Sequence, residues 1–152
     1  MKRLFILLSL VALVPATSVA EGQGLINKRS DFGVKRTLDR LENVLRKRGV
    51  TIVTRWNHRA KAKNVDIHLR PTELLIFGNP RLGSRFMTSD QTAGIDLPMK
   101  ALAWKDENGQ VWLTYNRPRY IANRHGIHNR EKAVHKMTKV LNELTNHATR
   151  RN

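Results

Sequence analysis

Residues 73–116 read ELLIFGNPRLGSRFMTSDQTAGIDLPMKALAWKDENGQVWLTYN, and this stretch sets the architecture of the chain. It opens with an apolar run, residues 74–77, in which apolar and polar side chains do not alternate. Pro71 before the run and Gly78 after it leave too little room for a buried helical segment, which is the alternative. The run therefore predicts a central strand with a neighbour on each edge and cover on both faces.

The same stretch closes with a predicted hairpin. Asn108-Gly109 lies between two alternating segments and favours a two-residue type I′ turn, in which both central residues need positive φ. This turn would place Trp104 opposite Leu113 on a shared apolar face. Because successive side chains of a strand point to opposite faces, a register shift of one residue would exchange the two faces.

The N-terminus has the pattern of a secretory signal peptide. Lys2 and Arg3 precede an apolar run over residues 4–14, and small residues lead up to Ala20. The run is shorter than the ~20 residues that a membrane-spanning helix needs. We therefore expect cleavage after Ala20, export to a bacterial periplasm and no transmembrane segment after processing. An uncleaved anchor is the alternative.

Residues 21–152 are expected to form one domain. Removing 20 of the 152 residues leaves 132, which is enough for a hydrophobic core. The sequence has no cysteine, which excludes disulfides, thiol catalysis and cysteine-ligated metals. The net charge of +16 includes Lys2 and Arg3, so the processed chain carries +14. In an exported protein this charge suits an anionic small molecule or envelope component rather than nucleic acid, and a solubility surface is the alternative.

Periodicity predicts the other main elements. Residues 33–48 and 130–148 repeat apolar side chains at helical spacing, whereas residues 25–29 and 50–56 are typical of strands. The expected order is strand, helix, several antiparallel strands and helix. We therefore predict an α+β domain with an antiparallel sheet of about four to five strands and both main helices on one face.

Five motifs together resemble the family described as domain of unknown function 302. They are WNHRAKA (56–62), LRPTELLIFGNPRLGSRFM (69–87), GIDLPMKALAW (94–104), VWLTYN (111–116) and RHGI (124–127). The resemblance implies a small α+β domain with a TATA-binding-protein-like order of elements, often paired as a homodimer, and it implies no established activity. Two positions depart from the family pattern. Asn57 stands where an acidic residue usually precedes the histidine, here His58, and Arg117 stands where an aspartate follows the last strand.

Four residues are candidates for a site. His58, just after a strand, could act as a base or bind a ligand, or could only bond a loop carbonyl. Asp96 lies in an apolar context and needs hydrogen-bond donors, either from His58 or Arg81 or from backbone N–H groups that it caps. Asn79 and Arg81 lie in the turn over residues 78–84, which could cradle an anion or simply lead into a helix. We expect these segments to form one groove for a small or anionic ligand.

A non-enzymatic binding or interaction module is the function that these residues favour. The alternatives are an enzyme of unknown class with His58 and Asp96 as catalytic residues, and a charge-driven binder of anionic envelope surfaces. No cofactor is expected, because the chain has no Walker loop, nucleophile elbow or His-Glu-x-x-His motif. Residues 125–135 hold three histidines, but Gly126 interrupts the helix there, so we expect surface histidines and no metal site.

Overall fold

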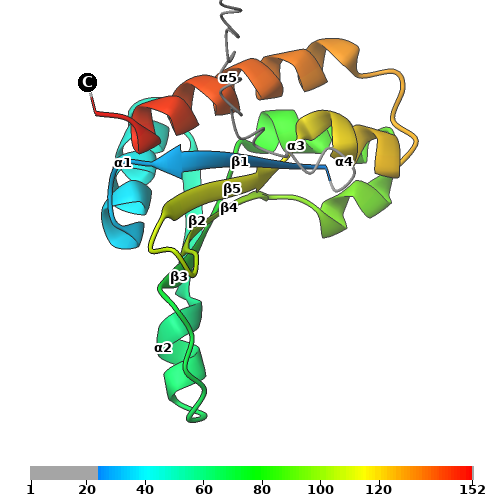
Figure 1. Cartoon of the computed structure of the whole chain (residues 1–152). Helices are drawn as coiled ribbons and strands as arrows, with labels where there is room; N and C mark the ends of the chain where they lie inside the picture. The colour runs from blue at the N-terminus through cyan, green and yellow to red at the C-terminus, as the bar shows by residue number, and fades with distance from the viewer. Residues whose placement is uncertain (1–23, 152) are drawn as a thin grey trace, which may run out of the picture.

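The computed structural model describes residues 24–151 (Figure 1). The predicted signal peptide lies outside the described residues. The elements in chain order are β1 (Leu25–Ser30), α1 (Val34–Lys47), β2 (Thr51–Asn57), α2 (His58–Lys63), β3 (Thr72–Gly78), α3 (Pro80–Met87), the 3₁₀ helix η2 (Gln91–Ile95), β4 (Met99–Lys105), β5 (Val111–Asn116), α4 (Pro118–Arg124) and α5 (Glu131–Thr149). Within residues 24–151, no helix combines the length and apolar character needed to cross a membrane.

The five strands form one antiparallel sheet in the order β1-β5-β4-β3-β2. β3 lies between β2 and β4, with Leu75 paired to Arg55 on one side and to Ala101 on the other. The prediction that residues 74–77 form an inner strand is therefore confirmed. β1 is an edge strand paired with β5, as expected for residues 25–29.

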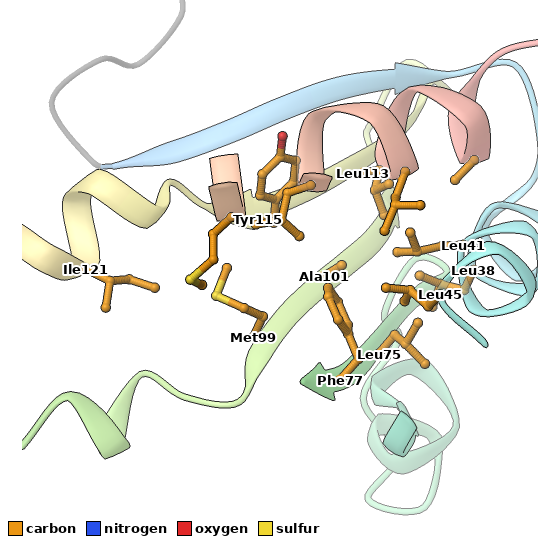
Figure 2. Close-up of a cluster of buried hydrophobic side chains, with 14 of the residues drawn as sticks. Leu38, Leu41, Leu45, Leu75, Phe77, Met99, Ala101, Leu113, Tyr115 and Ile121 are labelled. Atoms are coloured by element: carbon orange, nitrogen blue, oxygen red, sulfur yellow. The ribbon is translucent and has the colours of Figure 1, made fainter. Parts of the chain in front are cut away.

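Helices α1 and α5 cover one face of the sheet, and the hydrophobic core fills the space between (Figure 1). Leu38, Leu41 and Leu45 lie one turn apart on α1, and each is at most 1% exposed. Figure 2 shows them pointing toward Leu75 and Phe77 of β3. The α+β class with both main helices on one face is confirmed.

The opposite face of the sheet is only half-buried, which corrects the expectation of cover on both sides of β3. Leu75 is fully buried, whereas its neighbour Leu74 is partly exposed on the other face. The register pairs Trp56 with Leu74 and Trp104 with Trp112, so all three tryptophans share this open face. The register places Leu74 between Trp56 and Leu102, so large apolar side chains flank it on this open face.

The β4–β5 hairpin has a different register from the predicted one. Leu113 is paired with Ala103, and Trp104 is paired with Trp112. Trp104 and Leu113 therefore lie on opposite faces of the sheet, and the prediction of a shared face was wrong by one residue.

The turn of this hairpin explains the shift. Gly109 has φ of +81°, but Asn108 does not have positive φ, so the turn is not type I′. The carboxylate of Asp106 accepts hydrogen bonds from the backbone N–H of Asn108 at 3.0 Å and of Gln110 at 2.8 Å, and from the indole N–H of Trp112 at 2.8 Å. These bonds favour a longer loop than the two-residue turn that Asn-Gly alone suggests.

Candidate binding site

Strand β3 separates the four residues that the sequence singles out. The residue before His58 is paired with Glu73, at the start of β3, whereas Asn79 and Arg81 follow Gly78, at its end. Because a strand rises about 3.3 Å per residue, the length of β3 puts about 17 Å between these two groups.

Asp96 lies at the Gly78 end of the sheet, because Met99 at the start of β4 is paired with Phe77. The turn over residues 78–84 and the Asp96 loop therefore lie at one end of the molecule. His58 lies at the other end, where α2 extends away from the sheet (Figure 1). The expected groove between all three segments is not formed.

Asp96 takes its partners from the end of α4 rather than from His58 or Arg81. Its Oδ2 lies 2.7 Å from Nε2 of His125, and its Oδ1 accepts a hydrogen bond from Nη1 of Arg124 at 3.1 Å. The side chains of Asp96 and His125 are only 12% and 7% exposed. His125 is thus a largely buried histidine, which corrects the expectation of a surface residue.

The second ring nitrogen of His125 is also engaged. Its Nδ1 lies 2.9 Å from the hydroxyl oxygen of Thr92, and that hydroxyl donates to Oδ1 of Asp90 at 2.5 Å. The hydrogen bond from Thr92 is the main cause that holds the pKa of Asp90 below its ordinary value. Both ring nitrogens of His125 therefore take part in hydrogen bonds, Nδ1 with the Thr92 hydroxyl and Nε2 with the Asp96 carboxylate. The bonds join η2 to the end of α4.

An apolar cavity of about 200 Å³ lies at the same end of the sheet. The residues that line it come from α1, β2, β3, α3, β4, α5 and the loops between them: Leu45, Val50, Thr51, Val53, Phe77, Gly78, Asn79, Pro80, Leu82, Gly83, Leu97, Pro98, Met99, Met137, Val140, Leu141 and Leu144. Thr51 and Asn79 supply the polar side chains of this lining, and none of the lining residues is charged. Figure 2 shows three of the lining side chains, Leu45, Phe77 and Met99.

One wall of the cavity is positioned by the polar contacts around Asp96. Leu97 and Pro98 follow Asp96 directly and form this wall. The ammonium group of Lys100 donates to the carbonyl oxygens of Asp96 at 3.1 Å and of Pro98 at 3.3 Å. The contact between His125 and Asp96 therefore fixes the segment that lines the cavity on this side.

The other predicted residues have mainly structural contacts. The side-chain oxygen of Asn79 accepts a hydrogen bond from the N–H of Arg81 at 3.0 Å and caps α3, while the Arg81 side chain is exposed. His58 begins α2, which Asn57 caps by accepting from the N–H of Ala60 at 2.8 Å. Within residues 24–151, acidic and imidazole side chains do not gather in threes where they could hold a metal ion.

The sequence points to two parts of the cavity lining and does not reveal the parts that come from α1, β2 and α5. The turn after β3 and the segment before β4 were both singled out. Among the parts that were missed, α5 contributes Met137, Val140, Leu141 and Leu144, which have the spacing of an ordinary core stripe in the sequence. The partial exposure of Val140 distinguishes this part of the stripe from the rest, but periodicity does not reveal exposure.

Comparison with known proteins assigns the chain to a family. Residues 26–144 match the family model described as "Domain of unknown function DUF302". The chain is 42% identical over 113 residues to "Fluoride-specific ion channel FluC 1" of Brucella suis biovar 1 (strain 1330), a match that covers 74% of this chain and 44% of that protein. A protein of the same name from Brucella abortus biovar 1 (strain 9-941) is also 42% identical over 113 residues, with 74% and 42% covered. The chain spans less than half the length of these relatives.

The fold is also similar to a solved structure. The crystal structure of an uncharacterized conserved DUF302 protein from Bacillus stearothermophilus superimposes with a TM-score of 0.75 at 17% sequence identity. The match covers 83% of this chain and 98% of the other. It supports the α+β architecture.

Proposed function

The chain belongs to the DUF302 family, and from that premise we propose that it is a binding module that holds a small apolar group in the cavity beside β3. The observation that carries the proposal is a cavity of about 200 Å³ with no charged lining residue. Apolar cavities of about 150 Å³ engineered into another protein stay free of water and bind benzene. A hollow of this kind therefore gains free energy when an apolar group fills it.

The ligand that we propose is a small amphiphile, with an apolar end for the cavity and an anionic end. Its apolar end enters between β3 and α5, where Phe77 and Leu141 are almost fully buried. Its charged end stays at the opening, which the exposed Pro80 and Pro98 border. The Arg81 side chain next to Pro80 is exposed, so a carboxylate or phosphate at the opening would meet a cation.

Gly83 offers a sharp test, because it lines the cavity from within helix α3. A Cβ at this position would lie 3.9 Å from Cδ1 of Leu97, an ordinary contact, so Gly83→Ala fits. Gly83→Leu would extend a side chain from the same point into the cavity. Calorimetric titration with octanoate should show binding by the wild type and Gly83→Ala, and about tenfold weaker binding or none by Gly83→Leu.

Two outcomes would contradict the binding proposal. One is that octanoate, octanol and benzene all give no heat of binding and no shift in melting temperature. The other is equal binding by Gly83→Leu and Gly83→Ala. Gly83→Ala also controls for folding, because alanine in a helix stabilises it by up to about 1 kcal/mol relative to glycine.

A second candidate function follows from the relatives named fluoride-specific ion channels. We propose, as the alternative, that the domain binds fluoride near such a channel, and the net charge of +16 supports an anion as ligand. The ¹⁹F NMR signal of sodium fluoride should then broaden or shift when the protein is added. An excess of sodium chloride should not reverse this change. An unchanged signal at a molar excess of protein would reject this candidate.

We further propose that the chain acts after export, because residues 1–20 carry the signal-peptide pattern. Fusion of the first 30 residues to alkaline phosphatase, which is active only after export, tests this. We expect the fusion to have phosphatase activity and the Leu7→Arg substitution, which interrupts the apolar run, to abolish it. An inactive fusion would reject export.

A further inference from the structure

Residues 58–70, which lie between β2 and β3, form an arm that extends away from the body of the protein (Figure 1). Its helix α2 has no buried residue. The backbone returns from α2 to β3 through residues 64–70, most of which are exposed. The arm therefore adds little to the hydrophobic core. Backbone hydrogen bonds hold it in a defined shape instead.

The tip of the arm is a well-defined helix end. The N–H of Ile67 donates to the carbonyl of Ala62 at 3.0 Å, and the N–H of Asp66 donates to that of Lys63 at 3.2 Å. Asp66 has φ of +56°. These three features together are the Schellman motif, in which the residue after the helix adopts the left-handed conformation. The tip is thus held by the backbone and does not depend on burial of its side chains.

This tip presents two apolar side chains to solvent. Val65 is 64% exposed and Ile67 is 61% exposed. Placed on either side of Asp66, they form a small apolar end on a projecting element. Exposed apolar side chains that occur together at such a place are typical of an interaction site, whereas isolated ones are ordinary.

The stem of the arm is basic. It carries Arg59, Lys61, Lys63 and Arg70 against a single acidic residue, Asp66. The ammonium group of Lys61 lies 4.8 Å from the ring centre of Trp56, at the base of the arm. Basic side chains around an apolar end are the combination that binds anionic lipid surfaces, since cations contact lipid phosphates while apolar groups enter the interface.

We propose that the arm docks the protein on an anionic membrane surface, with Val65 and Ile67 entering the interface and the basic stem contacting lipid phosphates. A second copy of the chain suits the arm less well, because the whole molecule has 28 Lys and Arg against 12 Asp and Glu and two copies repel each other. The arm and the cavity are separate surfaces at opposite ends of β3. The inference therefore does not depend on the ligand proposed above.

The test is sedimentation with lipid vesicles. The protein used begins at Glu21, which removes the apolar residues 4–14 and keeps all the described elements. Vesicles of phosphatidylcholine alone are compared with vesicles that contain about 30% phosphatidylglycerol. We expect binding to the anionic vesicles only, which decreases steeply as salt is raised because screening shortens the range of the charges.

Two variants separate the arm from the rest of the surface. Val65→Ser/Ile67→Ser removes the apolar tip, and Ile95→Ser removes a side chain that is 72% exposed elsewhere on the molecule. Both leave the core untouched, so melting temperatures should stay close to that of the wild type. We expect partition of the tip variant onto anionic vesicles to decrease about tenfold and that of Ile95→Ser to change less than about twofold.

Three results would overturn the inference. The wild type does not bind anionic vesicles, or the tip variant binds as well as the wild type, or Ile95→Ser weakens binding as much as the tip variant does. A fourth, concentration-dependent assembly without lipid that the tip variant abolishes, would instead make the arm an interface between copies.

Discussion

At the scale of single residues, the contact between Asp96 and His125 holds the cavity wall in place. It joins the loop before β4 to the end of α4 across 29 positions of sequence. Arg124 and Thr92 extend it, so that a buried imidazole and a carboxylate of 12% exposure both have partners. A polar group buried without a partner would instead destabilise the fold.

His125→Ala should lower the free energy of unfolding by about 2 kcal/mol, because it removes the hydrogen-bond partner of Asp96 Oδ2 and leaves a void. Urea denaturation measures the change. Asn123→Ala, at an exposed position of the same helix, is the matched control and should shift the free energy by less than about 0.5 kcal/mol. Equal effects of the two substitutions would show that the contact does not contribute to stability.

Asp66→Gly should raise stability by about 0.5 kcal/mol, because glycine adopts the left-handed conformation at φ of +56° without steric cost. The same urea experiment detects it as a higher midpoint with an unchanged slope. Asp66→Val is the opposite control, since a β-branched residue is strained there, and should lower the midpoint. A lower midpoint for the glycine variant would mean that the Asp66 side chain itself stabilises the tip.

At the scale of elements, the β4–β5 hairpin shows how one side chain can determine the type and length of a turn. The dipeptide Asn108-Gly109 correctly located the turn, but not its length. The three hydrogen bonds to the Asp106 carboxylate decide the length, and with it which face Trp104 occupies. A turn residue outside the central pair thus sets the register of the whole hairpin.

Asp106→Asn should lower the melting temperature at pH 7, because the amide has only one acceptor oxygen. Chiefly through its bond with Trp112, the hairpin lowers the pKa of Asp106 in the folded protein. A carboxyl group with a lowered folded-state pKa stabilises the protein above its unfolded-state pKa of about 3.9 and loses that effect as the pH falls through the folded-state value. The gap in melting temperature between wild type and variant should therefore close below about pH 4, and a gap that stays constant would contradict the role of Asp106.

The spacing of apolar residues along the sequence predicted those elements that depend on neighbouring residues alone. The inner strand at residues 74–77, the edge strand β1 and the amphipathic helices α1 and α5 all followed from periodicity. The pairing of Asp96 with His125 did not follow, because it depends on how the end of α4 is placed against η2. The sequence identified Asp96 as a carboxylate that needs donors, which is correct, but could not say which donors the fold brings to it.

The separation of His58 from Asp96 has a similar cause. His58 precedes β3, and Asp96 follows it just before β4 begins, so the length of β3 separates the two residues. The predicted strand over residues 74–77 and the turn over residues 78–84 already imply this separation, since a strand fixes which loops lie at each of its ends.

At the scale of the whole molecule, the sheet has one packed face and one open face. The packed face holds α1, α5 and the core, and the open face carries the three tryptophans. The cavity lies at the end of the packed face, where α5 lines one side of it and the segment Leu97–Pro98 lines another. The arm leaves from the opposite end of β3 (Figure 1). Ligand binding and membrane docking, as proposed, would therefore use different ends of one rigid sheet.

Two adjacent leucines test this one-sided arrangement. Leu75→Ala removes a fully buried side chain from the packed face and should cost about 3 kcal/mol in free energy of unfolding. Leu74→Ala makes the same change one residue earlier, on the open face, and should cost about 1 kcal/mol, because its side chain is partly exposed already. Chemical denaturation gives both values, and equal losses would mean that a second layer covers the open face.

The central claim is that an apolar hollow at the end of β3 accepts an apolar guest. A crystal structure of the protein under xenon pressure tests it most directly, because xenon enters dry apolar cavities and scatters strongly. We predict a xenon atom in contact with Phe77, Leu97 and Met137. Side chains that fill this space, or xenon bound elsewhere with none beside Phe77, would contradict the claim.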